Sequence, residues 1–133
     1  MILADSRVWI DFFRNVRNRQ TAFLADHLAS EESFVVIGDL ILMEILQGAK
    51  DDAHARRIAN RLSILPEVAI CDAHLARAAA SNYRRLRAHG ITVRKTIDTL
   101  IATRCIVDDY ALLYSDRDFD PFVEHLGLRS AMA

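Results

Sequence analysis

The stretch from 95 to 119 constrains the fold more than any other part of the sequence. Apolar side chains recur at helical spacing in its first half, which predicts a helix with one apolar face. Those positions are Ile97, Leu100, Ile101 and Cys105. The apolar run 111–114 then predicts a buried strand, and the polar segment 115–118 follows it at once. A helix that leads into a buried strand is part of a βαβ unit, and such units build parallel sheets.

The predicted helix and the strand after it bring two acids, Asp98 and Asp116, close together. Thr96 is the expected N-cap, because its hydroxyl can accept a hydrogen bond from a free backbone N–H of the first turn. Asp98 lies in that turn, where the positive end of the helix dipole stabilises a carboxylate. Asp108 and Asp109 interrupt the apolar pattern and predict the end of the helix. Since the chain then turns back through the strand, Asp98 and Asp116 are expected to lie in one neighbourhood.

The same alternation of short apolar runs and helical patterns continues along the rest of the chain. Strands are predicted at 2–4, 34–37 and 68–70, and a last edge strand is expected to begin at 127–128. Helices are predicted to follow Ser6 and to cover 21–30, 39–47, 51–62, 72–87 and 121–126, with Gly48 as the C-cap of the third. The pattern predicts an α/β fold, with a parallel sheet and helices on both of its faces.

Length and composition place the chain in a broad class. At 133 residues it is expected to be one domain, over 1–133, that buries a real core. The net charge of −1 gives no global sign of nucleic-acid binding, so any such binding depends on local patches. Cys71 and Cys105 are isolated in apolar surroundings and are expected to be buried, reduced thiols. No signal peptide and no run of about 20 apolar residues is found, so the expected location is the cytoplasm.

Acidic residues mark a candidate metal site. Asp5 and Asp116 both follow predicted strands, and the carboxyl ends of parallel strands meet at the edge of the sheet where ligands bind. Asp98 and Glu44 approach that edge from helices. Four converging carboxylates repel one another and raise one another's pKa unless a cation neutralises them. Oxygen ligands of this kind suit Mg²⁺ or Mn²⁺ rather than zinc, and no cluster of histidine or cysteine competes.

Each acid also has an ordinary structural explanation. An aspartate at the end of a strand is usually a cap or a turn residue, so only the convergence of the acids favours a site. Glu44 lies within the almost entirely apolar segment 40–46, where an unpaired charge costs several kcal/mol. The alternative for Glu44 is therefore a salt bridge with an arginine.

Four ordered motifs give a more specific indication. MILADSRVWIDFFR, LMEILQGA, KTIDTLIATRCI and LLYSDRDFDPFVEHLGL resemble, in this order and spacing, a PIN-domain protein. Among PIN-domain proteins the resemblance is strongest to the VapC toxins of bacterial toxin–antitoxin pairs. It covers nearly the whole chain and implies a three-layer α/β/α fold with a short, mainly parallel sheet of four or five strands.

The resemblance also implies roles for individual residues. The family's four catalytic acids correspond to Asp5, Glu44, Asp98 and Asp116, of which the three aspartates are the expected metal ligands. Auxiliary positions are Asp118, an acid that only some members have, and Ser6, the usual hydroxyl residue after the first aspartate. Arg7 departs from the pattern, because Ser or Thr is more common there. This cation beside the site is expected to contact phosphate or to pair with an acid.

The resemblance implies a function as a Mg²⁺- or Mn²⁺-dependent endoribonuclease. The expected substrate is transfer RNA, other structured RNA or messenger RNA, cleaved by metal-activated water, and the expected partners are a second copy in a homodimer and a cognate VapB-like antitoxin. No Ser–His or Cys–His nucleophile is required, and the histidines have scattered, polar contexts. Basic residues near the key helix are expected either to hold the RNA backbone or to form a solvated face. These are Arg84, Arg85, Arg87, Arg94 and Lys95.

Two other classes remain as alternatives. A receiver-like phosphoacceptor domain also has acids at the strand ends of a parallel sheet. It requires two adjacent acids after the first strand and a lysine after a late strand, whereas this chain has Asp5 alone and its Lys95 precedes a helix. The second alternative is a PIN fold without turnover that binds RNA or protein.

Overall fold

A parallel sheet organises the molecule. The computed structural model describes residues 1–32 and 34–132, and within them five strands form one sheet in the order β3-β2-β1-β4-β5. The strands are β1 (Ile2–Ala4), β2 (Val35–Gly38), β3 (Glu67–Val68), β4 (Ala111–Leu113) and β5 (Arg129–Ser130). Every neighbouring pair is parallel, and Leu3 at the centre lies beside both Val36 and Leu112. The predicted α/β class is therefore confirmed.

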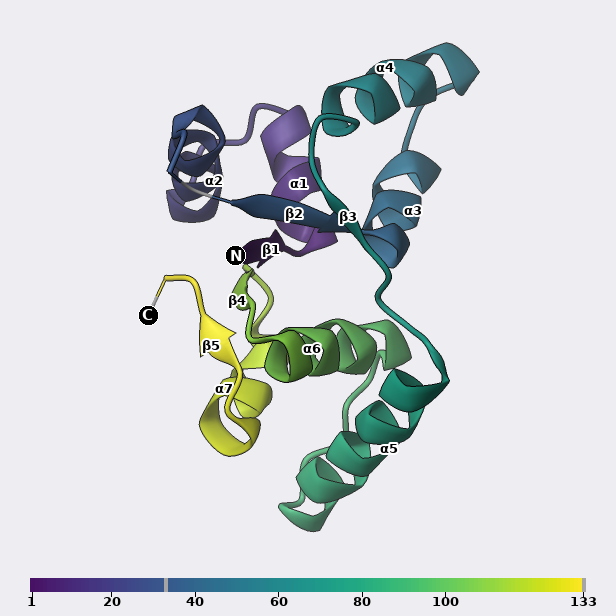
Figure 1. Ribbon diagram of the computed structural model, residues 1–133, viewed down its shortest axis with the longest axis vertical. Helices are drawn as coiled ribbons and strands as arrows, with labels where there is room; N and C mark the ends of the chain where they lie inside the picture. Colours follow the sequence, from purple (N-terminus) through teal and green to yellow (C-terminus); the bar gives the residue numbers. More distant parts are fainter. Residues whose placement is uncertain (33, 133) are drawn as a thin grey trace.

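Helices connect the strands and enclose the sheet. They are α1 (Ser6–Phe13), α2 (Arg19–Ala29), α3 (Asp39–Gln47), α4 (Asp52–Leu62), α5 (Ala73–Ala88), α6 (Thr96–Asp108) and α7 (Asp120–Leu126), with the 3₁₀ turn η1 (Arg117–Phe119) before α7. In the view of Figure 1, α1 to α4 gather around β1 and β2 in the upper half, and α5 to α7 lie with β4 and β5 in the lower half. Within the described part of the chain, no helix is both long enough and apolar enough to cross a bilayer.

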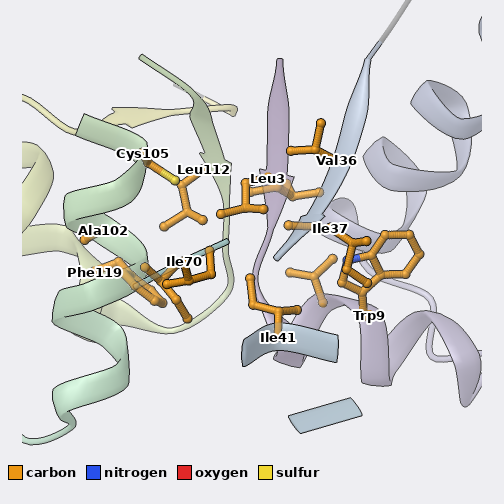
Figure 2. Close-up of a cluster of buried hydrophobic side chains, with 14 of the residues drawn as sticks. Leu3, Trp9, Val36, Ile37, Ile41, Ile70, Ala102, Cys105, Leu112 and Phe119 are labelled. Atoms are coloured by element: carbon orange, nitrogen blue, oxygen red, sulfur yellow. The ribbon is translucent and has the colours of Figure 1, made fainter. Parts of the chain in front are cut away.

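The core lies on both sides of β1. Figure 2 shows Trp9 of α1 on one side of the central strands and residues of α6 on the other. Leu3 and Leu112 are fully buried, and Trp9 is 1% exposed. Because β1 and β4 are buried on both faces, they read as continuous apolar runs rather than as alternating patterns.

Glycine is required where α3 begins beside the segment after β3. A Cβ atom on Gly38 would lie 2.5 Å from the side chain of Ile70, which is fully buried. The N–H of Ile70 donates to Oδ1 of Asp39 at 2.9 Å rather than to a neighbouring strand. Strand β3 ends at Val68, so the predicted strand 68–70 begins one residue late and extends two residues too far.

Other boundaries differ for local reasons. β2 runs from Val35 to Gly38 rather than over 34–37, and Phe34 is 63% exposed. The N-cap of α6 is Lys95, and no side chain caps that helix, so the expected role of Thr96 is wrong. Gly48 does end α3, but with φ at −84° it lacks the left-handed geometry of a glycine C-cap. Cys105 is buried as expected, whereas Cys71 is exposed.

Two predicted elements also have shifted starting points. α2 begins at Arg19 rather than at Thr21, because Asn18 and Thr21 form a reciprocal capping box. The last strand begins at Arg129, after Gly127 adopts φ +80° at the end of α7.

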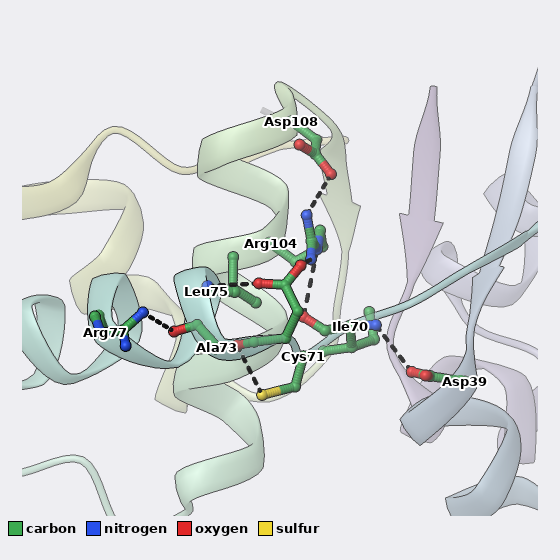
Figure 3. Close-up of polar contacts among 9 residues, drawn as sticks. Asp39, Ile70, Cys71, Ala73, Leu75, Arg77, Arg104 and Asp108 are labelled. Carbon is green, nitrogen blue, oxygen red and sulfur yellow. Dashed lines mark hydrogen bonds and ion pairs between the residues drawn. The ribbon is translucent and has the colours of Figure 1, made fainter.

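A largely buried arginine connects α6 to the start of α5. The side chain of Arg104 is 12% exposed and lies 3.2 Å from Asp72 and 2.9 Å from Asp108. Its Nε donates to the carbonyl of Ile70 at 3.3 Å, and Figure 3 shows these contacts meeting at one side chain. Asp72 also caps α5 by accepting from the N–H of Leu75 at 2.8 Å. Arg104 therefore helps to fix the position of α6, the helix that carries Asp98.

Candidate active site

The four acids that the sequence singles out line one pocket at the carboxyl ends of β1 and β4. This acidic pocket has a volume of about 460 Å³. Its lining residues are Asp5, Ser6, Arg7, Ile10, Glu44, Lys95, Thr96, Ile97, Asp98 and Asp116. Asp118 and Arg94 lie outside this lining but are paired with each other nearby. The sequence does not indicate that Ile10 and Ile97 line the pocket; Ile97 is expected only on the apolar face of its helix. The signal for Ile10 is its position one helical turn after Ser6.

Asp5 is held by the centre of the sheet. Its N–H donates to the carbonyl of Leu113 at 2.9 Å, and its own carbonyl accepts from Val8 at 3.1 Å as α1 begins. The residue is 6% exposed. Burial raises the pKa of the Asp5 carboxyl to about 7, with further contributions from the charges of Asp98 and Glu44. The amides of Ser6 and Arg7 lie close enough to oppose part of this shift, although the side chain makes no capping hydrogen bond.

Asp98 lies in the first turn of α6 and is 7% exposed. Its Oδ2 atom is buried and has no hydrogen-bond partner within the described residues. Burial raises the pKa of Asp98 to about 6; the charge of Lys95 lowers it, and the charges of Asp116, Asp118 and Glu44 raise it. A buried carboxylate oxygen without a donor is costly unless a cation or a ligand meets it.

Glu44 projects from α3 and is half-buried. Its Oε1 atom is buried, and within residues 1–32 and 34–132 it has no hydrogen-bond partner. The ion pairs found in the same residues do not include Glu44. The alternative of a salt bridge with an arginine is therefore not what the structure shows, and the side chain lines the acidic pocket instead.

Asp116 and Asp118 occupy the turn after β4. Asp116 is the N-cap of η1, and its Oδ1 accepts from the N–H of Asp118 at 2.9 Å. One oxygen each of Asp98, Asp116 and Asp118 lies within 4.8 Å of the other two. The family resemblance implies that Asp5, Asp98 and Asp116 are the metal ligands and that Asp118 is an auxiliary acid. The structure places Asp118 in one group with Asp98 and Asp116, and Asp5 lies outside that group but lines the acidic pocket.

The basic residues divide into two sets. Arg7 lies 3.3 Å from Asp11, Lys95 lies 3.6 Å from Asp116, and Arg94 contacts both oxygens of Asp118 at 3.0 and 3.2 Å. These three residues are close to the acids. The expected set on α5 is not part of the acidic pocket; Arg84 lines a separate apolar pocket next to Cys71, and Arg85 donates to Asn82.

The donor set fits a hard divalent cation. The anionic groups that converge are all carboxylates, and the described lining contains neither histidine nor cysteine. Two buried carboxylate oxygens have no hydrogen-bond partner within the described residues, and burial raises the pKa of Asp5 and of Asp98, so the ionised carboxylates are costly here without a cation. Oxygen-only sites of this kind are typical of Mg²⁺ and Mn²⁺.

Comparison with known proteins defines the class. The family model of the PIN domain matches residues 2–123, and the chain therefore belongs to the PIN-domain family. This membership removes the receiver-like alternative.

The relatives narrow the class further. The chain is 34% identical over 131 residues to the VapC ribonuclease Mb1587 of Mycobacterium bovis, with 98% of each chain covered. It has the same identity and coverage to ribonuclease VapC11 of Mycobacterium tuberculosis, so within the PIN-domain family it groups with the VapC proteins.

Solved structures share the fold at low sequence identity. The structure of VapBC2 from Rickettsia felis, bound to a DNA fragment from its promoter, has a TM-score of 0.76 at 16% identity and covers 98% of this chain and 97% of that one. The structure of FitAcB from Neisseria gonorrhoeae has a TM-score of 0.71 at 17% identity and covers 98% and 96% of the two chains.

Proposed function

We propose that this protein is the ribonuclease toxin of a toxin–antitoxin pair and that it cleaves RNA in the acidic pocket. The observation that carries the proposal is a pocket lined by Asp5, Glu44, Asp98 and Asp116 in a chain that is 34% identical to VapC ribonucleases over 98% of its length. The expected substrate is transfer RNA, other structured RNA or messenger RNA, and the expected location is the cytoplasm.

The cofactor in this proposal is Mg²⁺ or Mn²⁺, held by Asp5, Asp98 and Asp116, with Asp118 as an additional acid beside them. Such an ion supplies the acidity that makes water a nucleophile at neutral pH and offsets the charge of the attacked phosphate. Oε1 of Glu44, which has no hydrogen-bond partner within the described residues, would orient the attacking water. Ser6 contributes a hydroxyl at the pocket wall, and Arg7 with Lys95 holds the RNA phosphates at the rim.

The direct test is cleavage of single-stranded and loop-containing RNA by the purified chain. We expect cleavage with Mg²⁺ or Mn²⁺ and none in excess chelator, because none of the pocket side chains is a strong nucleophile. Restoring the ion after chelation should restore the rate. Cleavage that continues in chelator would contradict the metal-dependent mechanism, and RNA binding without cleavage under any ion would favour the alternative of an inactive PIN module.

The antitoxin is the proposed regulator of this activity. The structures that share the fold include a toxin–antitoxin complex from Klebsiella pneumoniae, at a TM-score of 0.70 and 18% identity over 98% of this chain and 97% of that one. We infer a cognate VapB-like protein that covers the acidic pocket and blocks access of RNA. A neighbouring reading frame that encodes a small DNA-binding protein is its expected source.

A homodimer is the proposed assembly. α5 exposes Ala73, Ala76 and Ala80, and an apolar pocket of about 550 Å³ lies beside it. We expect light scattering at tens of micromolar to give the mass of two chains, and Ala76→Glu on α5 to shift that mass toward one chain. Ala53→Glu, at an exposed position of α4, is the matched control and should leave the dimer intact. A strictly monomeric wild-type protein at that concentration would rule this assembly out.

A further inference from the structure

Lys95 directly precedes α6, and its ammonium group lies 3.6 Å from Oδ2 of Asp116. The other oxygen of Asp116 is already engaged, because Oδ1 accepts the backbone N–H of Asp118 at 2.9 Å. Oδ2 of Asp116 accepts no backbone hydrogen bond from the described residues and is the oxygen that the ion pair with Lys95 involves. The amine of Lys95 is the cation next to that oxygen.

The surrounding acids create a demand for positive charge at this point. Asp98, Asp116 and Asp118 each have a carboxylate oxygen within 4.8 Å of the others. Asp98 is 7% exposed, and its buried Oδ2 has no partner within the described residues. Lys95 compensates the negative charge of these three aspartates only from the edge of the acidic pocket, because its side chain is 63% exposed.

We propose, resting on the proposed function, that Lys95 competes with the divalent ion for Oδ2 of Asp116 and turns to the RNA backbone once the ion is held. Two cations held against the same carboxylate of Asp116 repel each other, so binding of the ion weakens the contact of Lys95 with Oδ2. A lysine carries its charge on a long flexible stem, so it can leave the carboxylate without movement of the backbone. The released amine stays at the rim of the pocket, where a phosphate must pass. Lys95 is thus a positioning residue that couples ion binding to RNA binding.

The turn that carries Asp116 does not depend on Lys95 for its position. Arg94 contacts both oxygens of Asp118, and Phe119 is fully buried in the core. The hydroxyl of Tyr114 donates to Asp120 at 2.8 Å. Replacing Lys95 should therefore remove one charge and leave the geometry of the acids unchanged.

The first measurement is Mn²⁺ binding to the metal-free full chain by titration calorimetry at low ionic strength. We expect Lys95→Met to bind Mn²⁺ about three- to tenfold more tightly than the wild type, because a competing positive charge is removed. Lys95→Arg keeps the charge and should stay near the wild-type affinity. Lys50, between α3 and α4, is also an exposed lysine. Lys50→Met removes the same charge there and should not change the affinity for Mn²⁺.

The second measurement is the binding of a cleavage-resistant 2′-O-methyl RNA, followed by fluorescence anisotropy with and without Mn²⁺. With Mn²⁺, Lys95→Met should bind this RNA severalfold more weakly and with a salt slope reduced by about one. Without Mn²⁺, the variant and the wild type should differ little, because the lysine is then engaged by Asp116.

Three results would overturn parts of this scheme, and they are distinguishable. Unchanged or weaker Mn²⁺ binding by Lys95→Met would overturn the competition. An equal loss of RNA affinity with and without Mn²⁺ would overturn the release of Lys95. A wild-type chain that binds no Mn²⁺ would overturn the metal part of the proposed function together with this inference.

Discussion

Replacing Asp98 with asparagine is expected to lower the rate of RNA cleavage by about three orders of magnitude or more, because residues that act as one unit fail together. The same variant should melt at the same temperature as the wild type or higher when divalent ions are absent. Oδ2 of Asp98 is buried and has no partner among the residues that the structure describes, and burial with neighbouring acids raises the pKa of this carboxyl to about 6. An amide removes that unfavourable charge at nearly the same volume.

The measurements are single-turnover cleavage in Mn²⁺ and thermal unfolding at pH 7.5 with and without the ion. Asp26→Asn on α2 is the control, since it neutralises an exposed acid far along the chain from the pocket. It should change neither quantity. A large drop in the melting temperature of metal-free Asp98→Asn would show that the carboxylate has a structural role in α6.

Stability without divalent ions is expected to fall as the pH rises from about 4 to 7. The pKa of Asp5 is 3.8 as a free group and about 7 in the folded protein, so the folded state binds more protons between these values. The free energy of unfolding therefore decreases with pH across this window and stays low above it. One pKa unit corresponds to about 1.4 kcal/mol, so the loss for Asp5 is on the order of a few kcal/mol.

Denaturant unfolding at pH 5 and pH 8 checks this expectation. Asp5→Asn should make the decrease smaller and should be more stable than the wild type at pH 8; Asp98, whose pKa is raised to about 6, contributes the remainder. Mn²⁺ should stabilise the wild type more at pH 8 than at pH 5, because the ion binds the deprotonated carboxylates of the folded state. A wild-type protein with equal stability at both pH values in chelator would contradict the raised pKa of Asp5.

The gathering of the acids was predictable because it follows from the parallel sheet. Asp5 and Asp116 follow strands that are neighbours, so their side chains are brought to the same edge whatever the details of the loops. The place of Asp98 in the pocket was predictable because the residue lies in the first turn of α6. The position of Glu44 in the pocket depends on which side of α3 faces the sheet, and a helix that is apolar on nearly all sides does not specify this.

Long-range polar pairings could not be predicted from local patterns. The pair between Arg94 and Asp118 joins residues 24 positions apart, and Asp118 lies in one group with Asp98 and Asp116. The N–H of Ile70, just after β3, donates to Asp39, which lies 31 positions earlier in the chain. α6 also buries polar residues outside its predicted apolar face. Asn82 of α5 donates to the buried hydroxyl of Thr103 at 3.1 Å.

The central place of β1 has a consequence for the synthesis of the protein. β1 is synthesised well before its partner β4, which begins at Ala111, and the acids of the pocket span positions 5 to 116. Sheet pairings between such distant segments form late and slowly. A nascent chain that ends before position 116 cannot hold the full group of carboxylates. The acidic pocket therefore assembles only after the segment that carries Asp116 has been synthesised.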